Sequence, residues 1–302
     1  MPFVLSDHYV CAVGSIAELE KIASQVRRDI VRQVHYAKSG HPGGSLGCAD
    51  FLTALYFEVM SYTKTFHMSG ENEDVFFLSN GHISPLWYSI LARAGFFDIT
   101  ELSTFRRLDS RLQGHPATAE GLPGIRIASG SLGQGISVAI GMGLAKKLNQ
   151  DDKTIYVLTG DGELQEGQIW EAAMCAPHHK VDNLIAVVDR NGQQIDGPNE
   201  EVMSLGDLAG KWKSFGWIVL EMNGNVMQEV VDTLQHAKAQ LGNGQPVVIL
   251  MKTEMGSGVD YMMGSHKWHG IAPDEEQTEN ALSQLPETLG DYTYDPLYQS
   301  PH

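Results

Sequence analysis

The sequence is poor in basic residues. It carries 21 Lys and Arg against 37 Asp and Glu in 302 residues, which gives a net charge of −16, and it contains no basic block. Nucleic acids and anionic membranes select basic surfaces, so we expect neither as a partner. A site for an anionic ligand must therefore be local and built from a metal ion, backbone amides, histidines or another chain.

Cysteines and long apolar runs are also scarce. The three cysteines are far apart and lack CxxC spacing, which predicts buried thiols in a reducing cytoplasm: Cys11, Cys48 and Cys175. No run approaches the roughly eighteen apolar residues of a membrane span, and the first residues lack a basic signal-peptide region. We therefore expect neither export nor membrane insertion. There is no internal repeat or low-complexity segment.

Glycine, by contrast, is abundant, with 32 residues, and it punctuates short apolar runs. Strands are predicted at 74–79, 154–159, 183–189, 217–221 and 246–251. Helices are predicted at 14–38, 49–60, 84–94, 136–148, 167–178, 207–215 and 226–241. This alternation predicts the α/β class, with a doubly wound parallel sheet and helices on both faces. We expect one domain over 1–285 and a carboxyl-terminal tail over 286–302.

Polar residues follow two neighbouring predicted strands. Asp161 lies between Gly160 and Gly162 after one strand, and Asn191 follows the next. Carboxyl ends of parallel strands meet at one edge of a sheet, where ligands of such folds bind. Oxygens from Asp161, Asn191 and a free carbonyl near Gln193 suit Mg²⁺, and the glycines permit close approach of a diphosphate. These residues therefore predict a site for magnesium and a diphosphate.

Four histidines lie at expected turns or strand ends. His41 lies in the glycine- and proline-rich segment 39–47, which is expected to be a turn that interrupts the first helix. His82 follows a predicted strand, and His115 and His269 lie in irregular stretches. Taken singly, each is as expected of a solvated surface residue. The turn 129–135 leads into a helix whose amino end could receive a diphosphate.

Seven short motifs occur in a fixed order along the chain: SGHPGGSLG (39–47), LSNGH (78–82), GHP (114–116), LGQGIS (132–137), GDGELQEG (160–167), IDG (195–197) and WHG (268–270). In these motifs the chain resembles the amino-terminal, thiamine diphosphate-binding half of a transketolase. The resemblance implies an enzyme that transfers a two-carbon ketol unit from a ketose phosphate to an aldose phosphate. It also implies thiamine diphosphate and Mg²⁺ as cofactors.

The resemblance assigns roles to individual residues. It implies that Mg²⁺ is held by Asp161, Asn191 and the carbonyl of Gln193, although Gln193 replaces a usual aliphatic residue. Gly162 and the turn Gly130-Ser131-Leu132 would touch the cofactor, although Ser131 stands where the family often has proline. Four histidines would surround the diphosphate, the thiazolium ring and the substrate hydroxyls: His41, His82, His115 and His269. Two of them, His82 and His269, would also bind the cofactor.

Glu166 has two interpretations. By resemblance it is a catalytic-site residue near the aminopyrimidine region of a neighbouring chain, where it would help keep a second carboxyl group protonated. Otherwise it is an acid at the amino end of a helix, stabilised by the helix dipole. His266 is interpreted as a solvated neighbour of the site.

The chain is about half as long as a complete transketolase, which carries a second α/β domain. That domain supplies the glutamate that activates the pyrimidine ring and arginines for the substrate phosphate, and neither follows residue 302. The resemblance therefore implies a split enzyme. Its separately encoded carboxyl-terminal subunit would bring the pyrimidine-binding domain, and two copies of each chain would form a heterotetramer.

Three alternatives remain at this stage. A deoxyxylulose-phosphate synthase-like half shares fold and cofactor, but the SGHPGG, GHP and WHG motifs favour a transketolase. A non-catalytic thiamine diphosphate-binding interaction subunit would have no chemical reason to keep Asp161, Asn191 and four histidines. A pyruvate dehydrogenase-type decarboxylase half does not fit the histidines of GHP and WHG.

Overall fold

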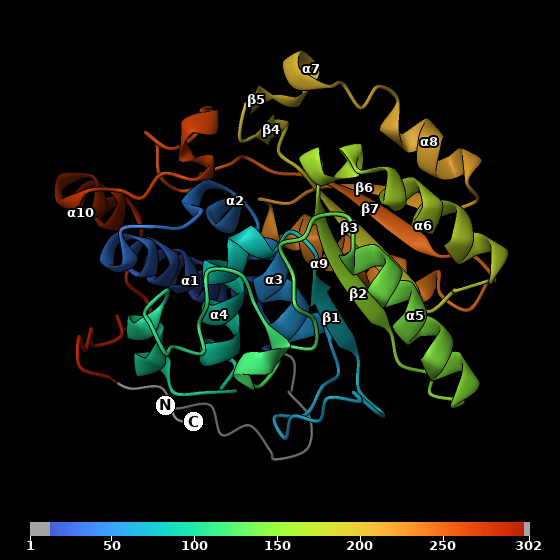
Figure 1. The fold of residues 1–302 in the computed structure, drawn as a ribbon, viewed down its shortest axis with the longest axis horizontal. Coiled ribbons are helices and arrows are strands. Elements are labelled where there is room, and N and C mark those ends of the chain that lie inside the picture. Colours follow the sequence, from blue (N-terminus) through green and yellow to red (C-terminus); the bar gives the residue numbers. More distant parts are fainter. Residues whose placement is uncertain (1–12, 299–302) are drawn as a thin grey trace.

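A five-stranded parallel sheet forms the centre of the molecule in a computed structural model that describes residues 13–298. The strand order is β1-β2-β3-β7-β6, and every neighbouring pair is parallel (Figure 1). The strands of the sheet are β1 Val75–Leu78, β2 Ile155–Gly160, β3 Leu184–Arg190, β6 Ile218–Asn223 and β7 Val247–Lys252. A two-residue hairpin beside the sheet pairs β4 Gln193–Gln194 with β5 Gly197–Pro198.

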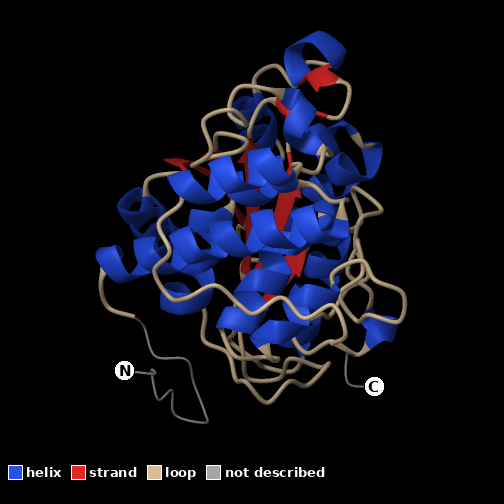
Figure 2. Ribbon diagram, turned by 90° about the vertical axis from the view of Figure 1, so that its left-hand side faces the viewer, coloured by secondary structure: helices blue, strands red, loops and turns tan. Residues whose placement is uncertain are grey.

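Helices cover both faces of this sheet (Figures 1 and 2). One layer holds α1 Ile16–Ala37, α3 Ala49–Ala54, α4 Ser84–Arg93 and α9 Met227–Ala239. The other holds α5 Gly135–Leu148, α6 Gly167–His178 and α8 Leu208–Ser214. The remaining α-helices of the described residues are α2 Pro42–Gly47, α7 Asn199–Val202 and α10 Glu275–Gln284. The structure thus confirms the predicted doubly wound α/β fold.

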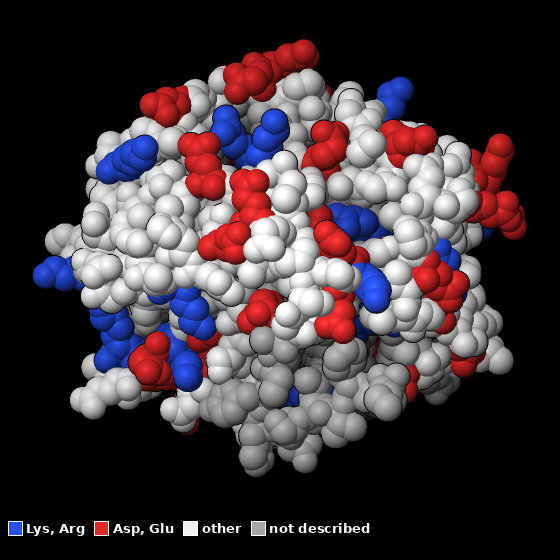
Figure 3. Space-filling model, turned by 180° about the vertical axis from the view of Figure 1, so that it is seen from behind, with Lys and Arg blue, Asp and Glu red and all other residues white. Residues whose placement is uncertain are grey.

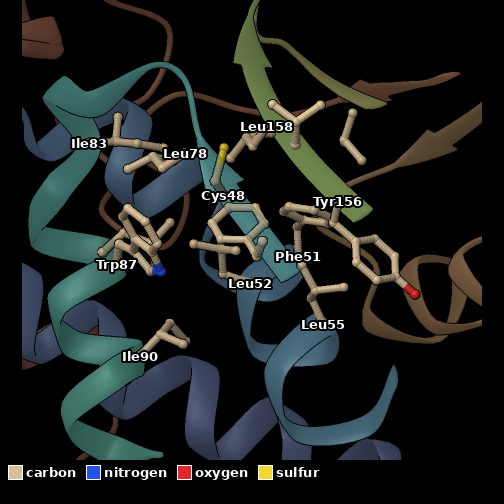
Figure 4. Packing of buried hydrophobic residues seen from close by; sticks show 14 of the residues in the cluster. Cys48, Phe51, Leu52, Leu55, Leu78, Ile83, Trp87, Ile90, Tyr156 and Leu158 are labelled. Carbon is tan, nitrogen blue, oxygen red and sulfur yellow. The ribbon is translucent and has the colours of Figure 1, made fainter. Parts of the chain in front are cut away.

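The core lies between the sheet and the first helix layer. The strands β1, β2, β3 and β7 are buried along almost their whole length, as expected for parallel strands covered on both faces. Phe51 and Leu52 of α3 pack toward the sheet beside Trp87 of α4 (Figure 4). Cys48 is buried in the same cluster, Cys175 is half-buried, and Cys11 lies outside the described residues.

The glycine- and proline-rich segment 39–47 corrects one expectation. The first helix does end at Ala37, where Lys38 adopts a left-handed conformation. The chain then returns to helix at Pro42 and does not remain a turn. Proline fits the first turn of a helix because the amide hydrogen that it lacks has no helical partner there. His41 is therefore the residue at the amino end of α2.

The segment predicted as a tail packs against α1 from Pro286 to Tyr294. Arg28 of α1 pairs with Asp291 at 2.8 Å, and Tyr36 stacks on Tyr294 with ring centroids 3.7 Å apart. Tyr292 is only 4 % exposed. These contacts fix the described part of the segment to the first helix layer.

Candidate functional site

A cavity of about 330 Å³ opens at the carboxyl ends of β1, β2 and β3. This is the edge at which the sequence places the metal and diphosphate site. The lining combines histidines, glycines and oxygen donors from separate chain segments: His41, Asn80, His82, His115, Gly130, Leu132, Gly160, Asp161, Gly162, Glu163, Asp189, Asn191, Gln193, Gln194, Ile195 and His269. No lysine or arginine is among them.

The four histidines form one group around this cavity. The ring centroids of His41 and His82 are 5.1 Å apart, and those of His82 and His269 are 5.0 Å apart. His41 lies 5.7 Å from His269 and 6.4 Å from His115. Side chains from four distant segments therefore meet, as the resemblance implies. His115 is exposed at the rim, whereas the others are half-buried.

The surroundings keep these histidines neutral. Burial, reinforced by His269, Arg106 and His115, lowers the pKa of His41 to about 4. Burial also lowers the pKa of His82, His115 and His269. The buried Nδ1 atoms of His41 and His269 have no hydrogen-bond partner among the described residues. Neutral imidazoles with unused nitrogens can accept a proton or a hydrogen bond from a bound ligand.

The oxygen donors predicted for Mg²⁺ lie beside the histidines. Asp161 is 2 % exposed, and its carboxylate accepts the Gly192 amide at 2.7 Å and the Gly162 amide at 2.8 Å. Asn191 Oδ1 accepts the Gln193 amide at 2.9 Å, and an amide oxygen keeps a second lone pair. Burial and nearby Asp189 raise the pKa of Asp161 to about 7. A bound cation would compensate this carboxylate, so the donor set fits Mg²⁺.

Two glycines allow the cavity walls to pack closely against each other. Gly130 has φ +103°, and a Cβ there would lie 2.4 Å from the His115 ring. A Cβ on Gly162 would lie 3.2 Å from Gln194. Gly130, Leu132 and Gly162 line the cavity, whereas the exposed Ser131 does not.

Glu166 and His266 lie outside this cavity. Glu166 is exposed at the amino end of α6 and makes no capping hydrogen bond. His266 is half-buried and begins the short helix His266–His269. Glu166 therefore does not line this chain's own cavity, which leaves its predicted role dependent on a neighbouring chain.

Sequence reasoning missed Glu163, a buried carboxylate that ties three walls of the cavity together. Glu163 accepts the hydroxyl of Ser79 at the end of β1, the Gly133 amide at 2.7 Å and the Gly160 amide at 3.1 Å. Ser79 in turn accepts the Gly135 amide at 3.0 Å. Burial raises the pKa of Glu163. Its place inside GDGELQEG was the available signal, but its partners Ser79 and Gly133 lie far away in the sequence.

We expect Ser79→Ala to weaken cofactor binding about tenfold and to lower the free energy of unfolding by about 1–2 kcal/mol, because the Gly135 amide and Glu163 each lose a partner. Ser89→Ala is the matched control. Ser89 is also fully buried and hydrogen-bonded, to Gln33 and Pro85, but none of these residues lines the cavity. The control should lose similar stability and keep its cofactor affinity. Equal affinities in a calorimetric titration of both variants would remove Ser79 from the site.

Asp189 and Asn80 were missed as well. Asp189 is 2 % exposed and accepts Asn191 Nδ2 at 2.8 Å and the Thr253 hydroxyl. It therefore orients the asparagine of the predicted metal site. Asn80 has a buried Oδ1 with no partner among the described residues. Within 13–298, no cluster of three His, Cys, Asp or Glu side chains has the arrangement of a metal site, and no helix there is long and apolar enough to cross a membrane.

Comparison with known proteins identifies the family. The family model described as transketolase, thiamine diphosphate binding domain, matches residues 19–290. One of the subunits of an apulose-4-phosphate transketolase, from Phocaeicola vulgatus, is 41 % identical, with 91 % of this chain and 96 % of that protein covered. A 6-deoxy-6-sulfo-D-fructose transketolase subunit of a Clostridium species is 38 % identical, with 89 % and 96 % covered.

A solved structure adds the spatial match. Transketolase from Campylobacter jejuni superposes with a TM-score of 0.83 at 34 % identity over 90 % of this chain. The chain spans only 43 % of that transketolase. These findings confirm the predicted fold and the transketolase class of enzyme, and they do not favour the synthase alternative. The chain belongs to the transketolase family and corresponds to the thiamine diphosphate-binding domain of its members.

Proposed function

We propose that this chain is one of two separately encoded subunits of a transketolase, which together move a two-carbon ketol unit from a ketose to an aldose. The observation that carries the proposal is the group of four neutral histidines beside Asp161 and Asn191 in one cavity. The share of each relative's length that this chain covers supports a division of the enzyme into two subunits. The chain matches 96 % of the Phocaeicola vulgatus protein, which is itself a transketolase subunit, but 43 % of a solved transketolase.

The residues present fit the two cofactors. Asp161, Asn191 and the carbonyl of Gln193 would hold Mg²⁺, with Gly162, His82 and His269 beside the diphosphate. Gly130 and Leu132 would meet the organic part of the cofactor. Thiamine diphosphate supplies a carbon nucleophile at its thiazolium ring. Orphaned nitrogens on His41 and His269 support the fit, since buried polar atoms normally have partners.

The histidines suit the proton movements of ketol transfer. Breaking and forming a bond beside a hydroxyl-bearing carbon requires removal and return of a hydroxyl proton. Neutral imidazoles at pH 7 can accept that proton, and the depressed pKa values favour its return. His115 at the rim is placed to meet the substrate, and His41, 6.4 Å away, lies deeper.

The anionic end of the substrate calls for a second chain. The cavity lining contains no lysine or arginine among the described residues, and the chain is strongly acidic. Relatives act, by their names, on a sugar phosphate and a sulfo-sugar. We therefore assign recognition of a phosphate or sulfonate tail to the partner subunit, in a cytoplasmic heterotetramer.

The test combines this chain with the chain of the same source that matches the carboxyl-terminal part of transketolases. With thiamine diphosphate and Mg²⁺, we expect aldose release from a ketose phosphate only when both chains are present. Activity with pyruvate as donor would establish a synthase instead. Cofactor binding without transfer of any ketose unit, to acceptors with phosphate or sulfonate tails, would establish a non-catalytic role.

A further inference from the structure

Arg106 lies beside the candidate active site without lining the cavity. It follows the short helix Ile99–Thr104 and has a left-handed backbone conformation, with φ +59°. Its amide donates to the Leu112 carbonyl at 2.9 Å, which closes a loop shortly before the GHP motif. Left-handed conformations are uncommon for residues other than glycine. The fold therefore holds this arginine at a defined place next to the segment that carries His115.

The guanidinium of Arg106 joins the two segments that carry His41 and His115. Its Nη1 donates to Ser39 Oγ at 2.8 Å, two residues before His41. A Cβ added to Gly114 would lie 2.8 Å from Arg106 Cζ. The guanidinium therefore packs directly against the backbone of the residue before His115.

Helix α4 fixes the His115 segment from another side. Ser84 Oγ donates to the Gly114 carbonyl at 2.8 Å, and Tyr88 Oη donates to the Gln113 carbonyl at 2.8 Å. Both donor side chains are fully buried. The segment is thus anchored to the first helix layer, and Arg106 carries the link on to the segment of His41.

The charge of Arg106 is not paired with a carboxylate. On the rear face of this acidic chain, basic side chains are interspersed with acidic ones (Figure 3). Arg93, Arg111 and Arg126 each pair with a buried carboxylate. Arg106 has no such partner within 13–298, and its buried Nε has no hydrogen-bond partner there. Buried charges are normally paired because their desolvation is costly, so stability alone does not account for a guanidinium at this position.

We propose that Arg106 is a positioning residue of the ketol transfer, which sets through Ser39 and Gly114 how the rings of His41 and His115 lie at the cavity. The inference rests on the function proposed above. The two ring centroids are 6.4 Å apart, and their separation depends on two chain segments that are distant in the sequence. A link between those segments keeps both proton acceptors in place for one substrate.

The charge of Arg106 acts on the same two histidines. Together with burial, it lowers the pKa of His41 and of His115. Within the described chain, no carboxylate is among the groups that shift the pKa of either histidine. The other titratable groups around them and around Arg106 are His82, His269, Tyr88 and Glu120, the last of which acts on Tyr88. Removal of the guanidinium should therefore make both imidazoles easier to protonate.

Arg106→Met tests both effects in the two-chain enzyme, because it removes the charge and the planar fork but keeps an unbranched side chain. We expect kcat to fall about tenfold and the acid limb of its pH profile to move to higher pH. Affinity for thiamine diphosphate should stay unchanged, since Arg106 neither lines the cavity nor shifts the pKa of His82 or His269. Arg106→Lys keeps the charge and should restore the acid limb and most of kcat.

Two further variants separate the hydrogen bond from the charge. Ser39→Ala removes only the Nη1 contact, so kcat should fall about threefold with the acid limb unmoved. Arg107→Met is the matched control, because Arg107 lies in the same loop but donates to the carbonyls of Asp295 and Pro296. The control should keep both kcat and the acid limb.

An NMR titration of His115 in the isolated chain without cofactor measures the charge effect independently of the reaction. The pKa of His115 should rise in Arg106→Met and stay unchanged in Arg107→Met. If wild type transfers ketol units and Arg106→Met keeps its kcat and acid limb, this inference fails and the proposed function stands. A fall in kcat matched by a lower Tm, with the acid limb unmoved, would make Arg106 merely structural. If the wild-type pair of chains transfers no ketol unit, both proposals fail together.

Discussion

Asp161→Asn should abolish Mg²⁺-dependent binding of thiamine diphosphate and at the same time stabilise the isolated chain above pH 7. The first effect follows because the carboxylate is the one formal negative charge in the proposed donor set of Asp161, Asn191 and the Gln193 carbonyl. The second follows because this carboxylate is buried beside Asp189 and has no cationic partner among residues 13–298, which raises its pKa to about 7. Function and stability oppose each other at this residue.

The sign of the pH dependence follows from the raised pKa. The ordinary pKa of the aspartate is 3.8, so between about pH 4 and pH 7 the folded chain holds a proton that the unfolded chain has lost. Stability therefore falls as pH rises through that window. The difference corresponds to about 4 kcal/mol at pH 8. The substitution should recover about 1–3 kcal/mol, because an amide replaces one of two acceptors for Gly162 and Gly192.

Denaturant unfolding of the isolated chain without metal at pH 8 and pH 4 measures the stability effect, and calorimetry of the two-chain complex measures cofactor binding. The gain at pH 8 should largely vanish at pH 4. Asp152→Asn, at a side chain 93 % exposed, should change neither quantity. Retained Mg²⁺-dependent affinity in Asp161→Asn would contradict the metal assignment, and a loss of stability at pH 8 would contradict the electrostatic account.

The parts of the site that follow strands could be predicted from the sequence. The runs before Asp161 and Asn191 are apolar on both faces, which fixes neighbouring parallel strands and brings their ends together. The histidine group could not be derived in this way. His41 and His269 lie in segments without a strand or helix period, so only the resemblance joined them. Their 5.7 Å separation depends on packing between the start of α2 and the last part of the domain.

Glu163 and α10 were missed for different physical reasons. Glu163 stands in a motif in which the glycines and Asp161 carry the recognisable pattern. Its role depends on hydrogen bonds from Ser79 and Gly133, which come close to it only in the folded chain. α10 has few apolar residues, since only Thr278 and Ala281 are buried, so periodicity is weak. Its amino end does carry a capping box of Asp274 and Gln277, a local signal that predicts a helix start.

His115→Ala should lower kcat on the order of 100-fold or more while leaving the affinity for thiamine diphosphate within about threefold. His115 is exposed at the rim of the cavity, whereas His82 lies deeper, 5.0 Å from His269. Gly130 packs closely against the His115 ring, since a Cβ at this glycine would lie 2.4 Å from it. We therefore expect the His115 side chain to contact the incoming sugar and not the diphosphate.

The pH profile separates a proton-transfer role from a packing role. Burial, with Arg106 nearby, lowers the pKa of His115 from 6.5. The neutral, proton-accepting form therefore persists below that pH, and the acid limb of wild-type kcat should lie below pH 6.5. Added imidazole should restore part of the activity of His115→Ala, because it can diffuse into the exposed position. His67→Ala, at an exposed histidine before β1, should leave kcat unchanged. If kcat of His115→Ala equals that of wild type, His115 takes no part in the proton transfer, and His41 is left as the base nearest the substrate.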